Sequence, residues 1–140
     1  RIASVEARVD SAKEALAIFE KNPIIGVGFN AYRYARIRYG LSRENETLVS
    51  HAGAGTDNSY LFVLATTGIV GFLIFLDFWV NIIKITIRNF RSEVYARVAL
   101  ASIVGLLVNA ILINSLFYAP IMAWIFMLTG LSTIKESRRR

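Results

Sequence analysis

Apolar residues are distributed unevenly along the 140-residue chain. Residues 1–57 mix charged and apolar positions, whereas Asp77 is the only charge between Ser59 and Ile83, and residues 98–118 and 119–134 carry none. A transmembrane helix needs about 20 consecutive apolar residues. The pattern therefore predicts transmembrane helices over residues 58–83, 98–118 and 119–134, and the third, which is short, relies on basic residues at its end reaching the interface.

The first 57 residues have a different periodicity. Apolar side chains recur at helical spacing, at Ile2, Val5, Val9, Ala12, Leu16 and Phe19. This predicts an amphipathic helix that ends before Pro23, because a residue preceding proline avoids the helical region. The helix either packs on the protein's own spans or lies on the outer leaflet. We predict an all-α integral membrane protein, with amphipathic external helices and a loop followed by three transmembrane helices.

Glycines mark two further places. Gly26 and Gly28 predict a compact turn over residues 24–29, since glycine reaches backbone angles closed to other residues. Inside the first span, Ala65, Gly68 and Gly71 are three residues apart and predict a smooth stripe for close helix contact.

The formal net charge of +6 is placed mainly outside the apolar runs. A basic loop over residues 84–97 and a basic tail over residues 135–140 lie on the same side if there are three spans. The positive-inside rule then places both in the cytoplasm and residues 1–57 on the periplasmic or extracellular side of the inner membrane. The charge is thus a topology signal, and no nucleic-acid partner is needed to explain it. Because the chain begins at Arg1 and shows no signal peptide, we expect it to be the C-terminal part of a longer membrane protein, whose remaining transmembrane helices would be its partners.

The inventory of reactive side chains excludes several kinds of site. The chain has no Cys, which rules out disulfides and thiolate metal sites, and one histidine, His51, cannot form a histidine cluster. We therefore predict no metal and no cofactor.

Two polar stretches remain as candidates for chemistry. Residues 32–39 interleave three tyrosines with Arg33, Arg36 and Arg38. They fit either an interfacial segment, with arginines on lipid phosphate, or a clamp for a pyrophosphate or an anionic sugar, which arginine binds in a bidentate way. At the start of the first span, either Thr56 or Asp57 caps the helix, or Asp57 is a catalytic carboxylate; the residue types favour neither.

The order of these motifs resembles the catalytic region of the O-antigen ligase and polymerase superfamily. Arg8 is followed by a helix and by Asn22-Pro23-Ile24-Ile25-Gly26-Val27-Gly28-Phe29, then by Asp57-Asn58-Ser59-Tyr60-Leu61, and then by Thr67-Gly68-Ile69-Val70-Gly71 within a span. The resemblance covers roughly residues 6–76. The chain departs from the family pattern at Ala12, where the family has Trp, and at Asp57, where the ligases usually have His. Asp-Asn at this point is more like the polysaccharide polymerases.

The resemblance implies a metal-independent glycosyltransferase on the outer face of the cytoplasmic membrane. It would join polyprenyl-diphosphate-linked oligosaccharide repeat units into O-antigen, capsular or exopolysaccharide chains, with a glycan or lipid as acceptor. Asp57 would act as base or orienting group and Arg8 would bind the leaving group. Five further residues would bind or position substrate: Arg33, Arg36, Arg38, Asn58 and Tyr60. His51 lies six residues before Asp57 and would be a further substrate-binding residue, brought to the site by a mobile loop.

Two alternatives stay open. One is a ligase that passes the glycan to a lipid A-core or protein acceptor by the same chemistry. The other is a non-catalytic membrane subunit that binds glycan or serves as a scaffold.

Overall fold

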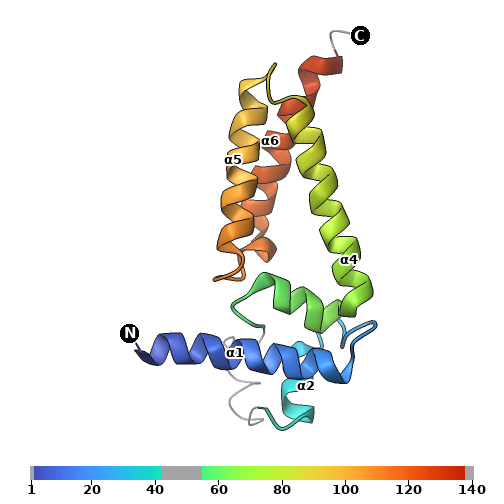
Figure 1. Ribbon diagram of the computed structural model, residues 1–140, viewed down its shortest axis with the longest axis vertical. Helices are drawn as coiled ribbons and strands as arrows, with labels where there is room; N and C mark the ends of the chain where they lie inside the picture. The colour runs from blue at the N-terminus through green and yellow to red at the C-terminus, as the bar shows by residue number, and fades with distance from the viewer. Residues whose placement is uncertain (1, 42–54, 138–140) are drawn as a thin grey trace. The chain divides into compact units, whose positions relative to one another are not determined.

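A computed structural model describes residues 2–41 and 55–137 of the chain, so His51 lies outside the described residues. These residues are helical and contain no strand, which confirms the all-α prediction. The helices are α1 (Ile2–Lys21), α2 (Tyr32–Arg38), α4 (Ser59–Arg88), α5 (Val94–Asn109), the short 3₁₀ helix η2 (Ser115–Phe117) and α6 (Ala119–Ser137) (Figure 1). As predicted, α1 ends before Pro23.

The chain divides into two compact units. The first comprises Arg1–Phe75 and Ile111–Asn114, and the second comprises Leu76–Ala110 and Ser115–Arg140. The core of the first unit joins α1, α2 and the beginning of α4, through Ala15, Ile18, Tyr32, Ala35, Phe62 and Ala65. The residues predicted to carry chemistry lie on or beside these three elements.

The helix α4 is broken at Gly68, where the backbone angles are φ 66° and ψ −169°. Residues 59–67 and the residues that follow Gly68 are thus two helical segments that meet at a kink (Figure 1). The stripe predicted at Gly68 in a continuous span is therefore wrong. At 1.5 Å per residue, residues 69–88 alone are about 30 Å long, which is the thickness of a bilayer's hydrocarbon core.

The glycine-containing turn after α1 fills this break with backbone hydrogen bonds. Two amides of the turn donate to carbonyls at the end of residues 59–67, and two carbonyls of the turn accept from amides at the start of residues 69–88. The four bonds are Val27 N to Ala65 O (3.1 Å), Gly28 N to Thr66 O (2.8 Å), Ile69 N to Pro23 O (2.8 Å) and Val70 N to Ile24 O (3.3 Å). They satisfy groups that a helix end leaves without partners. We call this arrangement the turn–break contact.

The turn–break contact requires glycine on both sides. A Cβ on Gly26 would meet the main chain of Thr66, and a Cβ on Gly68 would meet the carbonyl group of Ile24. Both glycines also have positive φ, which side chains with a Cβ rarely adopt. The prediction of a compact turn at residues 24–29 is thus confirmed.

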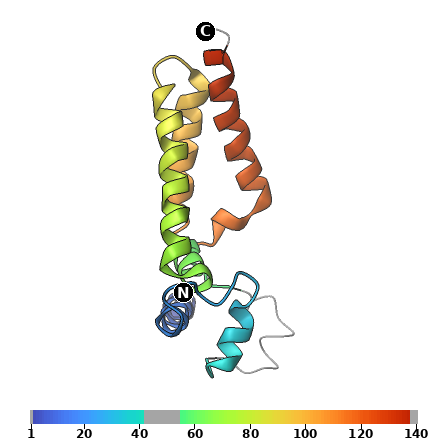
Figure 2. The ribbon, with the colours of Figure 1, turned by 90° about the vertical axis from the view of Figure 1, so that its right-hand side faces the viewer.

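The second unit contains the last part of α4 together with α5 and α6. The helices α5 and α6 run side by side (Figures 1 and 2). On α5 the buried residues are small or apolar: Ala96, Ala99, Ile103 and Leu106. Asn89 closes one end by donating from Nδ2 to the carbonyl of Ser132 (3.1 Å). Large apolar side chains cover much of the outer surface, including Val104, Val108, Trp124 and Met127.

Among the described residues, α4 is the one helix that is long and apolar enough, by length and composition, to cross a membrane. Only 28% of its most apolar stretch is buried within the protein. The helix continues to Arg88, five residues past the predicted end of the first span. The apolar helices α5 and α6 are shorter than a span by this measure, so three transmembrane helices stay a prediction.

The predicted second span differs most from the structure. The helix α5 ends at Asn109, and residues 110–118 form turns and η2 instead of continuing the helix. Residues 111–114 belong to the first unit, where the carbonyl of Ile111 accepts from Asn58 Nδ2 (2.9 Å) and that of Ile113 from Ser59 Oγ (3.5 Å). The third predicted span begins at residue 119, as α6 does.

Candidate functional site

Asn58 caps the helix that follows the Asp57-Asn58 motif. Its Oδ1 accepts hydrogen bonds from the backbone amides of Tyr60 (2.9 Å) and Leu61 (3.0 Å). These are the amides that an N-cap side chain normally satisfies. The interpretation in which Thr56 or Asp57 is the cap is therefore wrong.

Asp57 neither caps a helix nor bonds to another side chain in the described part of the chain. Its side chain is exposed and makes no hydrogen bond or ion pair with another described residue. Thr56, by contrast, is buried and its Oγ1 accepts a hydrogen bond from Ser11 Oγ at 3.0 Å. An exposed carboxylate that caps nothing is available to a ligand.

The hydrogen bond between Ser11 and Thr56 brings α1 to the segment that carries Asp57. Asp57 directly follows Thr56 in the chain. Arg8 precedes Ser11 by three positions on α1, so these two residues are neighbours on one face of the helix, about 5–6 Å apart between Cβ atoms. Arg8 is exposed and, within the described ranges 2–41 and 55–137, has no ion pair. The structure therefore joins the two segments that carry the predicted catalytic residues through one hydrogen bond.

The amide of Asn58 is used on both of its sides. While Oδ1 caps α4, Nδ2 donates to the carbonyl of Ile111. The neighbouring Ser59 donates from Oγ to Asn114 Oδ1 (3.0 Å). Asn114 thus contacts the start of α4, and this polar cluster fixes the position of the backbone next to Asp57.

The three arginines predicted to bind substrate have different surroundings. Arg36 Nε lies 2.8 Å from Glu14 Oε2, with the side chains 17% and 22% exposed, so this ion pair joins α2 to α1. Arg38 is exposed and Arg33 is half-buried, and neither has an ion-pair partner in the part of the chain that the structure describes. Arg36 therefore stabilises the packing of α2 on α1. Of the three arginines, Arg38 is the most accessible to a ligand.

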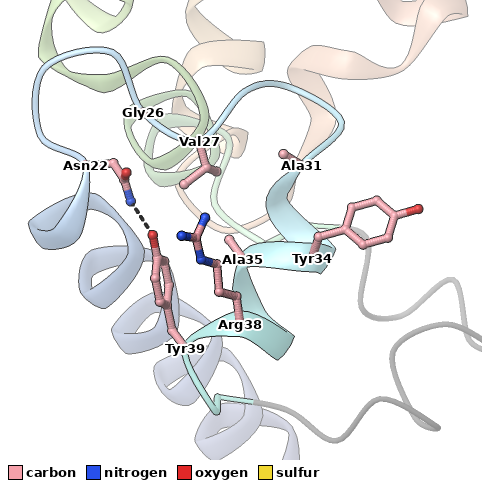
Figure 3. Close-up of a pocket in the computed structure, with 8 residues that line it drawn as sticks. All are labelled: Asn22, Gly26, Val27, Ala31, Tyr34, Ala35, Arg38 and Tyr39. Atoms are coloured by element: carbon pink, nitrogen blue, oxygen red, sulfur yellow. Dashed lines mark hydrogen bonds between the residues drawn. The ribbon is translucent and has the colours of Figure 1, made fainter.

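Arg38 borders a pocket of about 240 Å³ between the end of α1, the turn and α2. Figure 3 shows its guanidinium group lying between Tyr39 and Val27, whereas Tyr34 points away. At the same end, Asn22 Nδ2 donates to the hydroxyl of Tyr39 (2.7 Å). The Nζ of Lys21 lies 4.3 Å from the centre of the Tyr39 ring.

Tyr60 and Tyr32 show two different environments. Tyr60 is half-buried in the first turn of α4, with its ring 6.3 Å from that of Phe75. Tyr32 is 1% exposed, and its hydroxyl has no hydrogen-bond partner among the described residues. Burial, and next the charge of Glu14, raise the pKa of the Tyr32 hydroxyl, while Arg36 acts in the opposite direction.

Sequence reasoning did not identify Ser11, Glu14, Asn22 or Tyr39 as parts of the site. The contacts of these residues join positions 17 to 45 residues apart, or two helices, and no local pattern signals such pairs. The search for metal ligands gave no group of three acidic, histidine or cysteine side chains within the described residues. Metal independence stays a prediction.

Comparison with known proteins gives the family. The profile of the Wzy_C family, described as O-antigen ligase, matches residues 3–76, more than half of the chain. Searches among curated proteins and among solved structures gave no match. The matched segment ends one residue after Phe75, where the long stretch of the first unit ends, and it contains Arg8, the turn–break contact and Asp57. The chain therefore belongs to the O-antigen ligase family, whose members are membrane-associated and act in polysaccharide and lipopolysaccharide biosynthesis.

Proposed function

We propose that this chain carries the catalytic region of a polymerase that joins polyprenyl-diphosphate-linked repeat units into a surface polysaccharide. Family membership supports ligase- or polymerase-type glycosyl transfer with glycan and lipid substrates. The observation that carries the proposal is the pair Asp57 and Arg8. Both side chains are exposed, without partners among the described residues, and next to the same Ser11–Thr56 hydrogen bond.

The two residues have complementary tasks in this reaction. Asp57 accepts the proton of the acceptor sugar's hydroxyl as its oxygen forms a bond to the anomeric carbon of the donor. The bond from that carbon to the diphosphate oxygen breaks, and the lipid diphosphate leaves with the electron pair. Arg8 stabilises the negative charge that develops on the leaving group. A positioned carboxylate of this kind contributes about 10²–10⁴ in rate.

The site lies beside a helix whose later part is long enough for a membrane, which suits a lipid-borne donor. In the proposed topology, residues 1–57 lie on the outer face of the inner membrane and the basic segments 84–97 and 135–140 lie in the cytoplasm. The apolar outer surface of α5 and α6 supports their placement in lipid as the second and third spans.

The aspartate at position 57 favours the polymerase over the ligase. A ligase of this superfamily usually has histidine there, and His51 is the one histidine of the chain. The capping role of Asn58 supports a catalytic role of Asp57, because the Asp57 carboxylate is then not needed as the helix cap.

The test is complementation of a host that lacks its own surface-polysaccharide polymerase, with the length of the glycan chains measured on a gel. The intact protein is compared with Asp57→Asn and with Arg8→Ala. Two exposed residues serve as matched controls: Asp10→Asn on α1, whose partner Lys13 is also exposed, and Arg91→Ala in the second unit. Membrane levels of each variant are measured by immunoblot.

A polymerase whose site contains both residues loses long chains in the two site variants, at normal membrane levels, while single repeat units still reach their acceptor. Failure of single units to reach the acceptor would favour the ligase instead. Unchanged chain lengths in both site variants would contradict the roles of Asp57 and Arg8 and would leave the scaffold or glycan-binding alternative.

A further inference from the structure

The lining of the pocket beside Arg38 includes neither Asp57 nor Arg8. Its walls come from three neighbouring segments of the first unit: the end of α1, the turn and α2. One side is apolar, with Val27, Ala31 and Ala35. The other side is polar, with Arg38, Tyr39 and Asn22 (Figure 3). A ligand of this pocket has both an apolar face and an edge of polar groups.

The polar side of the pocket is positively charged. Arg38 contributes the charge directly, and Lys21 adds to it from its position on the Tyr39 ring. Among the described residues, no acidic side chain lines the pocket, and Glu14 of α1 is paired with Arg36. An anionic group is therefore favoured here, and the planar fork of an arginine fits a carboxylate in a bidentate way.

The remaining polar atoms suit hydroxyl groups. Asn22 donates from Nδ2 to the Tyr39 hydroxyl and to the carbonyl of Ile18. Among the described residues, no donor binds its Oδ1, which can accept from a ligand, and the Tyr39 hydroxyl has a proton to donate. A site for phosphate alone would need several converging cations or backbone amides and would not need an apolar wall. At about 240 Å³, the pocket is also smaller than the roughly 300–1,000 Å³ of sites for drug-sized ligands. The space suits one sugar ring.

We propose that this pocket binds one acidic sugar residue, with its carboxylate on Arg38 and its hydroxyls on Asn22 and Tyr39. The inference rests on the proposed function, since it identifies the glycan substrate as one whose repeat unit contains an acidic sugar. The pocket then holds that sugar while Asp57 and Arg8 act on the bond being formed.

The test measures binding of sodium glucuronate, glucose and inorganic phosphate to the intact protein in phosphatidylcholine nanodiscs, by saturation-transfer difference NMR. Glucuronate is expected to bind at least about tenfold more tightly than glucose, because an arginine–carboxylate pair is a charge-assisted interaction. Arg38→Gln should remove this preference, and Arg38→Lys should restore part of it. Ala31→Leu keeps the charge but narrows the pocket, and it should weaken glucuronate and glucose alike. Arg91→Gln is the matched control and should bind as the unaltered protein does.

The outcomes separate an acidic sugar from other anions. If inorganic phosphate displaces glucuronate at equal concentration, or if phosphatidylglycerol nanodiscs abolish its binding, the pocket is a phosphate or headgroup site and the proposal is wrong. Equal binding of glucuronate to Arg38→Gln would also overturn it. Asp57→Asn separates the two proposals, because this variant should keep glucuronate binding while it loses chain elongation. If Asp57→Asn elongates normally, the proposed function fails while the binding result still decides the pocket.

Discussion

Replacing Gly68 by alanine tests whether the turn–break contact holds the first unit together. Gly68 has φ 66° and ψ −169°, a region that is essentially restricted to glycine. Forcing a residue with a Cβ into such a region costs about 1–3 kcal/mol. In addition, the new Cβ would meet the main-chain carbonyl of Ile24, which cannot move aside as a flexible side chain could.

The second part of the cost comes from hydrogen bonds. Displacing Ile24 strains the two bonds nearest to Gly68, which are Ile69 N to Pro23 O and Val70 N to Ile24 O. Each such bond contributes about 0.5–1.5 kcal/mol. Together with the backbone term, we expect Gly68→Ala to destabilise the turn–break contact by about 2–6 kcal/mol.

Hydrogen exchange measured by mass spectrometry detects this loss locally. The amides of Val27 and Gly28 donate across the contact, and every 1.4 kcal/mol of lost stability makes an opening tenfold more frequent. Exchange of these amides in the intact protein in nanodiscs should therefore be at least about thirtyfold faster in Gly68→Ala. Gly105→Ala is the matched control, since a Cβ there meets nothing within 4 Å and alanine favours the helix. Unchanged exchange at Val27 and Gly28 in Gly68→Ala would refute the reasoning.

Three further predictions concern neighbouring contacts of the first unit. Asn58→Ala should lower thermal stability by about 0.5–2 kcal/mol through the lost cap, and Asn58→Asp, which keeps a capping oxygen, should lose less, as measured by circular dichroism. Ser11→Cys combined with Thr56→Cys should form a disulfide under mild oxidation, seen as a gel shift reversed by reductant, because the native oxygens lie 3.0 Å apart and the chain has no other Cys; no shift would contradict the placement of α1. The pKa of the Tyr32 hydroxyl is raised above its ordinary value of 10.0, so above pH 10.0 the unfolded chain loses this proton more readily than the folded protein does. The contribution of the protonated hydroxyl to stability is therefore complete below pH 10.0 and falls as the pH rises above that value. Tyr32→Phe should flatten this alkaline loss in thermal melts taken at increasing pH, and an unchanged pH profile would contradict the burial of the hydroxyl.

Local rules were sufficient for the elements before the loop. The end of α1 follows from Pro23, and the helical spacing of its apolar residues locates the helix itself. The turn at Gly26 and Gly28 also follows from residue type, because both have positive φ. These features depend on interactions within a few residues, which a sequence displays directly.

The break in α4 is invisible to hydropathy, because residues on both sides of Gly68 are apolar. A signal was nevertheless present, since glycine after Thr66-Thr67 is a common way to end a helix. What decides between a helical glycine and a terminating one is the partner segment, the turn at Pro23–Gly28, more than 35 residues earlier in the chain. The same limit applies to residues 111–114, whose hydrogen bond from Asn58 to Ile111 joins positions 53 residues apart.

The start of α4 presents a related ambiguity. Thr56, Asp57, Asn58 and Ser59 all have side chains that can cap a helix, so residue type alone cannot choose among them. In the structure Asn58 caps the helix. Thr56 is instead hydrogen-bonded to Ser11, and Ser59 to Asn114. Asp57 is the member of this run whose side chain makes no hydrogen bond or ion pair with another described residue.

The family motif therefore combines two kinds of residue with separate tasks. Its proline and its glycines build the turn–break contact, which fixes residues 59–67 against the turn that follows α1. In the proposed site, that arrangement in turn supports the Ser11–Thr56 bond, which joins the segment that carries Asp57 to the helix that carries Arg8. If this chain of dependence is correct, loosening the contact must disturb the reaction although no reacting group has been altered. Gly68→Ala should then shorten the polysaccharide as Asp57→Asn does, whereas Gly105→Ala should leave its length unchanged.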